Sequence, residues 1–425
     1  MTAKEFIKKA IERGFTNVQI TEKTSVSSEV YIINKEIDSY QDDYSTFYTI
    51  KAEYKKKTVK VATEFLEDEI IDLLFKKYTI TDSNYEDDYL EKSDTIPSAK
   101  PQDFDILKEI EQLKQVDSLR GKYPQVKNLS LTYEESYVNT RIINSNGVDI
   151  STDNYTCTFM VDTLTEKDGE FTSFDDKIIS TSKGDINFKQ MAEEVIKKLL
   201  IIADKEKIET AKYSVLIDRR VMSRLVNSFG GMLFAEKIRN KLSCLNDKID
   251  KKVFSDKLTI VEDPTNKDYP GYRLFDEEGT KTYKKDVIKK GVIKTYFYNI
   301  KEAKIASTKS TGNSYQNSIT RNMYVLPGKK STSELLECLH DGIYIVDYMS
   351  SGGTTVNSVN GDISLQVFGF VVKNGKLVSG IEPSILTTSI FELFSNIREI
   401  GDDLVFTGMT AASPSMLVNN ISIAR

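Results

Sequence analysis

Two hydrophobic periodicities divide the beginning of the chain into a helix and a set of strands. Over residues 3–13, apolar residues recur at the spacing of one helical face and Gly14 follows, which predicts an amphipathic helix that ends there. From Val18 to Glu64 the period changes to two among Thr and Tyr residues. This pattern predicts strands of an antiparallel sheet that has one face in water. A second helix is predicted over residues 66–77.

Residues 79–102 interrupt this pattern. The segment is acidic, contains Asn84, Pro97 and Pro101, and has no sustained periodicity, which favours a linker or an ordered crossover. We place the first internal boundary here. It separates an amino-terminal α/β domain, 1–100, from a central α/β domain, 101–210, that continues the same half.

The central region is predicted to hold strands between two helices. Helical periodicity returns over residues 103–114. The pairs Asn146-Gly147 and Asp168-Gly169 indicate hairpin turns, because these residue types accept a positive φ. The spacing Asn187-x-x-Gln190 resembles a capping box and predicts a helix that runs to Ile202.

The rest of the chain, 211–425, is predicted to form a β-rich domain. One helix is expected at 220–240, and short strands with frequent glycine-containing turns follow it. Many short strands at this spacing indicate a mostly antiparallel sandwich or barrel-like domain. The predicted fold class is therefore α+β, with an amino-terminal α/β half whose antiparallel sheet is flanked by helices.

The composition excludes several kinds of chemistry. The 425 residues include 58 Lys and Arg against 64 Asp and Glu, and only one His. The resulting net charge of −6 disfavours a dedicated nucleic-acid binder, which needs a basic face. A zinc site with two His ligands is impossible with His340 alone, and the same residue would have to serve any Ser-His-Asp or Cys-His catalysis. We expect His340 at the carboxyl end of a helix.

The cysteines and the apolar runs bear on the compartment. Cys157, Cys244 and Cys338 are odd in number and far apart, so we expect free, buried thiols and no disulfide framework. No apolar run approaches the roughly 18 residues needed to cross a bilayer. We therefore expect no membrane association and place the chain in the cytoplasm.

Two acidic runs are candidates for acid/base or hard-cation chemistry. They are residues 262–263 and 276–278. Paired carboxylates could exchange protons or bind a cation such as Ca²⁺. Residue type alone favours a simpler interpretation, in which these are turn and strand-end acids that face water.

The carboxyl-terminal half resembles the TldD/PmbA family, whose members were called modulators of DNA gyrase and later understood as metallopeptidase subunits. Four segments carry the likeness in the family's order and spacing: 274–280 (LFDEEGT) with 288–296 (IKKGVIKTY), 310–313 (STGN), 356–364 (VNSVNGDIS) with 369–370 and 374–375, and 397–404 (IREIGDDL) with 413–415 (SPS). The likeness continues more weakly through the amino-terminal half, including residues 141–147. It departs where residues 54–58 read Tyr-Lys-Lys-Lys-Thr, at a turn that usually contains glycine.

Within this family the chain is most similar to the PmbA branch, also called TldE. The TldD branch carries H-E-x-x-x-H on a helix and a late cysteine as a further ligand, whereas the PmbA branch has neither. The corresponding helix here includes residues 227–237 and has no His. The late segment, 408–415, has no Cys and ends in Ser-Pro-Ser.

The resemblance implies a non-catalytic subunit. In the family a TldD-like chain holds zinc and cleaves peptides inside a cavity that the PmbA-like chain completes. We therefore expect no metal in this chain, zinc only in a TldD-like partner, a heterodimer with that partner, extended peptides as ligands, and no direct contact with nucleic acid. The alternative is a stand-alone homodimer that binds extended peptides without cleaving them. A third possibility is an independent hydrolase that uses Glu236 or Asp276 with a hard cation.

Nine positions within the resembling segments are candidates for contact with the cavity or a peptide. Their residue types also suit turns, where Gly supplies positive φ and Asn or Asp bonds to the backbone, and we favour this structural role. They are Asp276, Glu277, Gly279, Thr311, Gly312, Asn313, Asn360, Gly361 and Asp362. No residue of this chain is predicted to be catalytic or to bind a metal.

Overall fold

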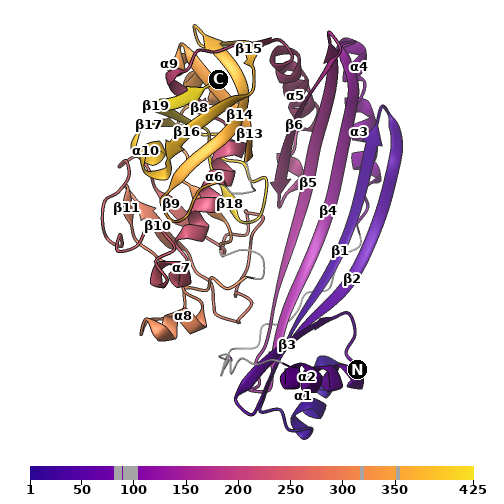
Figure 1. Cartoon of the computed structure of the whole chain (residues 1–425). Helices are drawn as coiled ribbons and strands as arrows, with labels where there is room; N and C mark the ends of the chain where they lie inside the picture. Colours follow the sequence, from indigo (N-terminus) through magenta and orange to yellow (C-terminus); the bar gives the residue numbers. More distant parts are fainter. Residues whose placement is uncertain (81–88, 90–103, 316–319, 351–354) are drawn as a thin grey trace.

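The computed structural model describes residues 1–80, 89, 104–315, 320–350 and 355–425. Figure 1 shows a long, curved sheet on one side and a strand-rich carboxyl-terminal half on the other. The first helix lies at one end of the sheet, and the carboxyl terminus lies near the opposite end. The fold is α+β, as the periodicities predict.

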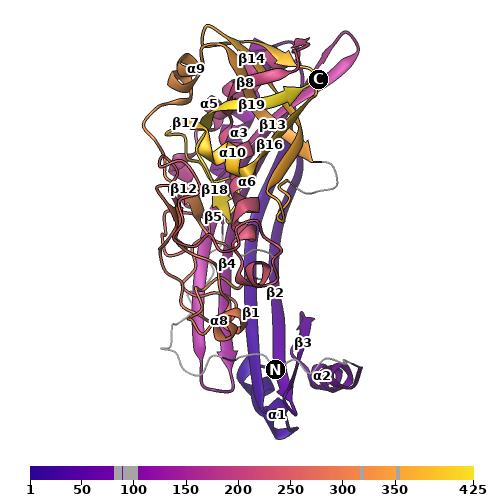
Figure 2. The ribbon, with the colours of Figure 1, turned by 60° about the vertical axis from the view of Figure 1, so that its left-hand side comes forward.

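One six-stranded antiparallel sheet forms the amino-terminal half. Its strands lie in the order β3-β2-β1-β4-β5-β6. Their bounds are β1 Asn17–Ile33, β2 Glu36–Tyr54, β3 Lys57–Thr63, β4 Val126–Asn144, β5 Asp149–Lys167 and β6 Glu170–Ser180. Strands from both sides of residue 100 belong to this one sheet. Figure 2 shows β1, β2, β4 and β5 running along most of the molecule's length.

The hairpin turns of this sheet use residues with positive φ. Asp168 and Gly169 have φ of 53° and 82° and join β5 to β6, which confirms the predicted turn. The turn between β2 and β3 uses Lys55 and Lys56, with φ of 47° and 64°. Two successive left-handed residues make the kind of tight turn that matches the twist of the strands. The turn therefore forms without the glycine that the resemblance led us to expect.

Helices cover the sheet near its two ends. At one end, α1 (Ala3–Glu12) and α2 (Asp68–Ile80) pack on β1 to β3. At the other end lies α5 (Phe188–Ile202), which packs on β5 and β6. The side chain of Asn187 accepts the N–H of Gln190 at 3.0 Å, which confirms the predicted cap. The remaining helices of this half are α3 Leu107–Val116, α4 Leu119–Lys122 and the 3₁₀ helix Lys183–Asp185.

Five strands of the carboxyl-terminal half close into a ring. β13 pairs with both β8 and β14, which closes the order β13-β8-β19-β16-β14. The bounds are β8 Ala211–Ile217, β13 Gly342–Ser350, β14 Asp362–Lys373, β16 Ser384–Ser389 and β19 Met416–Ala424. The core of the ring also includes apolar residues of α6 (Arg219–Met232). This closure confirms the barrel-like prediction.

Shorter elements surround the ring. A second sheet has the order β11-β10-β9-β12-β18. Its strands are β9 Ile260–Glu262, β10 Lys285–Lys289, β11 Val292–Ile293, β12 Met323–Val325 and β18 Ala411–Ala412. The other short elements are β7 Lys205–Glu206, β15 Lys376–Ile381, β17 Ile397–Ile400, α8 Ile300–Ile305, α9 Thr332–Leu339 and α10 Ile390–Ser395.

The single helix predicted over residues 220–240 is wrong, because the structure has two. α6 ends at Met232, and α7 (Ala235–Arg239) begins after Phe234. The backbone N–H of Phe297 donates to the carbonyl of Leu233 at 2.9 Å, and the N–H of Ala235 donates to the carbonyl of Phe297 at 2.8 Å. The chain leaves the helix between them because it pairs there with Phe297.

Candidate functional site

A cleft between the sheet and the carboxyl-terminal half is the candidate site. One of its two cavities has a volume of about 340 Å³ and lies between β1, β2 and β3 and residues 273–315 of the other half. The other measures about 100 Å³ and reaches β4 and β5. Lys23, Thr140 and Arg273 line both cavities, so we describe the two as one cleft.

Arg273 is positioned by a segment that is fixed to β5 on both of its sides. The side-chain amide of Asn154 donates to the carbonyl of Pro270 at 2.6 Å. The N–H of Leu274 donates to the hydroxyl of Thr152 at 3.4 Å. Beyond it, Phe275 is buried in an apolar cluster with Ile142, Val148 and Ile150 of the sheet. These contacts hold the loop that carries Arg273 against the floor of the cleft.

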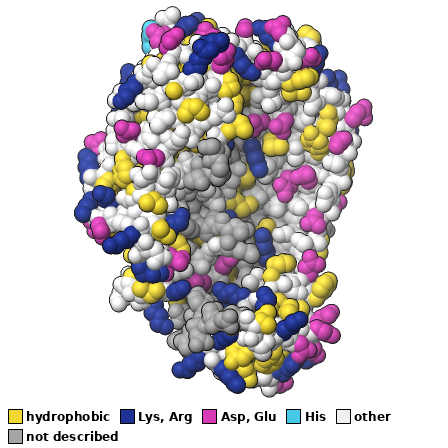
Figure 3. All heavy atoms as spheres, in the orientation of Figure 1, with side chains coloured by type: hydrophobic (Ala, Val, Ile, Leu, Met, Phe, Trp, Pro, Cys, Tyr) yellow, Lys and Arg dark blue, Asp and Glu magenta, His cyan; other side chains and the backbone are white. Residues whose placement is uncertain are grey.

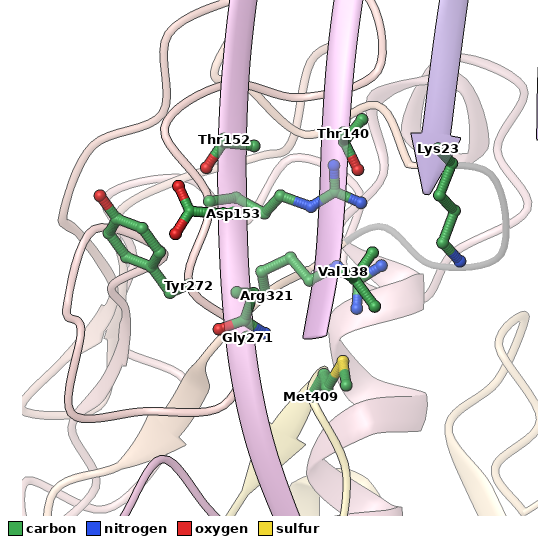
Figure 4. Close-up of a pocket in the computed structure, with 11 residues that line it drawn as sticks. Lys23, Val138, Thr140, Thr152, Asp153, Gly271, Tyr272, Arg321 and Met409 are labelled. Carbon is green, nitrogen blue, oxygen red and sulfur yellow. The ribbon is translucent and has the colours of Figure 1, made fainter. Parts of the chain in front are cut away.

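Arg321 enters the cleft from the loop before β12. The backbone N–H of Arg321 donates to the Glu262 carboxylate at 3.0 Å, and the guanidinium carbon of Arg321 lies 5.2 Å from the ring centroid of Tyr315. Figure 4 shows Arg321 reaching toward Val138 and Thr140 of β4, with Lys23 of β1 beyond them. Cations from both halves therefore meet at this one place.

The cleft desolvates its cations. Burial lowers the pKa of Arg273. It also lowers the pKa of Arg321 and Lys23, and for both the positive charge of Arg273 acts in the same direction. Glu277 is the carboxylate that opposes this effect on all three groups, and it lines the larger cavity. Like charges brought together in a partly dry site favour the binding of an anion.

Six of the nine predicted positions are brought together, and only Glu277 lines the cleft. Asp276 is fully buried, and its carboxylate accepts the N–H groups of Glu278, Thr280 and Ser314 at 3.0, 2.9 and 3.1 Å. Gly279 has φ of 85° and completes the same turn. The bond to Ser314 joins this turn to the second segment, Thr311 to Asn313.

The second segment, Thr311 to Asn313, is held by contacts with three other parts of the chain. The hydroxyl of Thr311 accepts the N–H of Tyr298 at 2.8 Å. A Cβ on Gly312, whose φ is 69°, would lie 3.0 Å from the carbonyl oxygen of Lys281. The amide of Asn313 donates to Glu262 at 2.8 Å. Gly312 thus has the positive φ that we favour for a turn, whereas the described bond of the Asn313 amide is to a buried carboxylate rather than to the backbone.

The third segment, Asn360 to Asp362, lies away from the cleft. Asn360 caps its own turn, since its carbonyl oxygen accepts the N–H of Asp362 at 3.0 Å and its amide donates to the Asp362 carboxylate at 2.6 Å. A Cβ on Gly361 would meet Ile390 and Cys244 at 3.1 and 3.2 Å. This turn therefore packs against α10 and lines neither cavity of the cleft.

The prediction that the acidic runs face water is wrong for Glu262 and Asp276, which are both fully buried. Lys285 lies opposite Glu262 in the β9–β10 pair, and its ammonium donates to the carboxylate at 2.6 Å. The three N–H donors stabilise the Asp276 carboxylate in the same way. Each acid is buried because the fold supplies a partner that sequence spacing does not reveal.

By the resemblance described above, α6 corresponds to a helix that would carry metal ligands in the TldD branch. α6 buries Val226, Phe229 and Met232, which are apolar and cannot replace imidazole ligands. Across the described residues, His, Cys, Asp and Glu form no group of three or more that could hold a metal ion. His340 ends α9 with φ of 60°, as predicted, and its side chain is 65% exposed. Figure 3 shows histidine, in cyan, at the rim of the molecule.

The residues that form the positive part of the cleft, Lys23, Arg273 and Arg321, were not among the predicted positions. Arg273 directly precedes the segment 274–280 that carries the family resemblance, and this adjacency is the one available signal.

Of the cysteines, Cys157 is buried, whereas Cys244 and Cys338 are half-buried; all three are free thiols. Among the described helices, none is long and apolar enough to cross a membrane.

The fold and the cleft define a two-part α+β protein with a polar, ligand-sized space between its halves. The descriptions PmbA/TldA metallopeptidase central domain and PmbA/TldA metallopeptidase C-terminal domain match residues 93–202 and 210–425. The chain belongs to the PmbA/TldD family.

Relatives from both branches share part of the chain. The metalloprotease TldD homologue of Buchnera aphidicola subsp. Acyrthosiphon pisum is 33% identical over 174 residues, which cover 39% of this chain and 35% of that protein. The metalloprotease PmbA homologue of the same organism is 26% identical over 254 residues, covering 59% of this chain and 54% of that protein. The matches thus span about a third to a half of these curated relatives.

Solved structures share the whole fold. A proposed modulator of DNA gyrase from Thermotoga maritima superposes with a TM-score of 0.86 at 22% identity, over 100% of both chains. TldE from Thermococcus kodakarensis gives a TM-score of 0.86 at 16% identity, over 99% of each chain. At these identities the likeness establishes the fold.

Proposed function

We propose that this chain is a PmbA/TldE-like, non-catalytic subunit of a TldD/TldE-type metallopeptidase that processes or degrades peptides. The observation that carries the proposal is the apolar inner face of α6, together with a single histidine that points to water at the end of α9. A chain with these side chains contributes walls and binding surface, and the zinc is held by a TldD-like partner. Enclosure of this kind excludes water and bulk protein from a peptidase site.

The long strand β2 supports the binding of extended peptides. β3 pairs with it only from Tyr48 to Tyr54, so among the described residues the outer edge of β2 from Glu36 to Phe47 has no strand partner. Such an edge presents free N–H and C=O groups to which an extended chain can add. Phe47 also lines the cleft, so this edge leads into the larger cavity.

The same strand supports contact with a partner subunit. Tyr40 and Tyr44 lie on one face of β2 and are 49% and 69% exposed. Large apolar rings in water are typical of surfaces that another chain covers. We assign this face to the TldD-like partner.

The first test is zinc analysis and a peptide-cleavage assay on the pure chain, repeated with a TldD-like partner. The pure chain should hold no stoichiometric zinc and cleave nothing, and cleavage should require the partner. Tyr40→Glu with Tyr44→Glu should weaken the heterodimer in native mass spectrometry. Phe171→Glu on β6, which changes a ring that is 64% exposed, is the matched control.

Other outcomes would identify the alternatives. A homodimer that binds peptides with no partner present would favour the stand-alone binding module. Metal-dependent cleavage by the pure chain, lost on Glu236→Ala or Asp276→Ala, would favour an independent hydrolase. A chain that binds no TldD-like protein would contradict the proposed function.

A further inference from the structure

Two arginines in the cleft have unused hydrogen-bond donors. The Nη1 of Arg273 and the Nε of Arg321 are buried and have no acceptor, and the hydroxyl of Tyr315 beside them has no partner either. Within the described parts of the chain, no ion pair joins either guanidinium to a carboxylate. Buried donors on a charged group are costly when they stay unpaired, so such atoms indicate a missing acceptor.

Three other arginines of this chain bond to carboxylates. Arg141 makes two bonds of 2.8 and 2.9 Å to Asp149, and Arg239 makes two bonds of 2.9 Å to Glu302. Arg219 bonds to Asp176 at 2.5 Å. The fold therefore supplies carboxylates to these three arginines, although the Nε of Arg219 is also unpaired, whereas neither cleft arginine forms an ion pair among the described contacts.

The carboxylates near the cleft either bond to other groups or line the cavities without pairing with the three cations. Glu262 is paired with Lys285, and Asp276 is saturated by backbone N–H groups. Glu277 and Asp153 line the two cavities without forming an ion pair with Arg273, Arg321 or Lys23 among the described contacts. Lys51, Lys60 and Glu278 also line the larger cavity, so five cations and three carboxylates line the two cavities and the site is net positive.

We propose that Arg273, Arg321 and Lys23 form a subsite for the carboxylate of a peptide that lies in the cleft. This inference rests on the proposed peptide-binding function. The guanidinium fork matches a planar carboxylate. The cavity of about 100 Å³ holds such a group, while the adjoining 340 Å³ along β1 to β3 holds the residues attached to it. Glu277 and Asp153 would repel a phosphate dianion more strongly than a singly charged carboxylate.

The carboxylate can come from the end of the peptide or from an Asp or Glu side chain. Three fluorescent peptides separate these sources: one with a free carboxyl terminus, its carboxyl-terminal amide, and the amide with one internal Glu. Binding is measured by anisotropy on the full chain, alone and with a TldD-like partner. We expect the free acid or the Glu-containing amide to bind roughly 10- to 100-fold more tightly than the plain amide.

Variants then assign the effect to the subsite. Arg273→Gln and Arg321→Gln should abolish the preference for a carboxylate, so that the free acid and the plain amide bind equally. Arg321→Lys keeps the charge but removes the fork, so it should lose most of the preference and serves if a Gln variant folds poorly. Arg398→Gln, at an exposed arginine of β17, is the matched control and should change nothing.

Each contrary outcome has a separate meaning. Equal binding of all three peptides overturns the subsite while the peptide-binding function stands. Competition by inorganic phosphate but not by acetate would assign the site to phosphate and overturn the carboxylate. If no peptide binds in either assembly state, the proposed function and the subsite fail together.

Discussion

The two halves of the molecule meet at two polar junctions that treat charge in opposite ways. In the first, which we call the closed junction, Asp176 of β6 pairs with Arg219 and Arg220 at the start of α6. Arg220 and Tyr344 of β13 in turn donate to Asp218. In the second, the cleft, Arg273 and Arg321 have unused donors and form no ion pair among the described contacts; Arg219 also has an unused Nε, so the ion pair is what separates the two junctions. The contrast indicates that the closed junction stabilises the arrangement of the halves, whereas the cleft keeps its charge for a ligand.

Removing the Asp218 charge should produce the largest effect. Its carboxylate accepts the N–H of Arg220 at 2.9 Å, the Nε of the same residue at 3.2 Å and the Tyr344 hydroxyl at 2.5 Å. Asp218→Asn leaves buried arginine charge undercompensated, so the free energy of unfolding should fall by about 3–5 kcal/mol in urea titrations. Asp347→Asn, which breaks an exposed pair with Arg224, should cost less than about 1 kcal/mol. Equal losses would remove the distinction between a closed junction and an ordinary surface pair.

Truncation of Phe275, which anchors the loop that carries Arg273, should have the second-largest effect on stability. Phe275 is 2% exposed and packs on Ile142, Val148 and Ile150. Phe275→Ala should cost about 3 kcal/mol and also weaken binding of the free-acid peptide, because the loop that carries Arg273 loses its fixed position. Phe171→Ala, at an exposed ring, should stay within about 0.5 kcal/mol. Unchanged peptide binding in Phe275→Ala would show that the anchor does not position Arg273.

The closed junction should also give a pH signature. Burial alone would raise the pKa of Asp218, but the charges of Arg220, Lys198 and Arg219 and the Tyr344 hydroxyl together hold it well below its usual range. The carboxylate's contribution is therefore complete above the unfolded pKa of about 3.9 and is lost as pH falls toward the folded pKa. The stability difference between the wild type and Asp218→Asn should be constant from pH 7 to about 4 and shrink below it. A difference that shrinks already near pH 6 would contradict this assignment.

The two junctions also differ in how far sequence could predict them. Local features were accessible because their partners lie within a few residues, as with the Asn187 cap, the Asp168-Gly169 turn and the helix end at His340. The charge clusters could not be predicted from the sequence. Arg219 pairs with Asp176, and Arg273 comes near Lys23, only after the two halves have packed together.

Strand register also explains why the sequence did not predict the burial of Glu262. Nothing within a few positions of Glu262 marks it as buried, and Lys285 reaches it only because β9 and β10 align those two residues. Sequence patterns therefore predicted the α+β fold and its turns. The cleft depends on long-range alignment, and functional sites are where local rules are expected to fail.

Replacing Arg273 should have the smallest effect on the folded chain and is the sharpest test of the contrast. Because no described carboxylate is lost with it, Arg273→Gln should leave the free energy of unfolding unchanged or raise it by up to about 1 kcal/mol in the absence of peptide. Arg219→Gln, which abandons the buried Asp176, should instead cost about 3 kcal/mol. Added free-acid peptide should raise the melting temperature of the wild type and not that of Arg273→Gln, since a ligand stabilises only the form that binds it. If Arg273→Gln destabilises the chain as much as Arg219→Gln does, Arg273 is a structural residue, and the two junctions do not differ in kind.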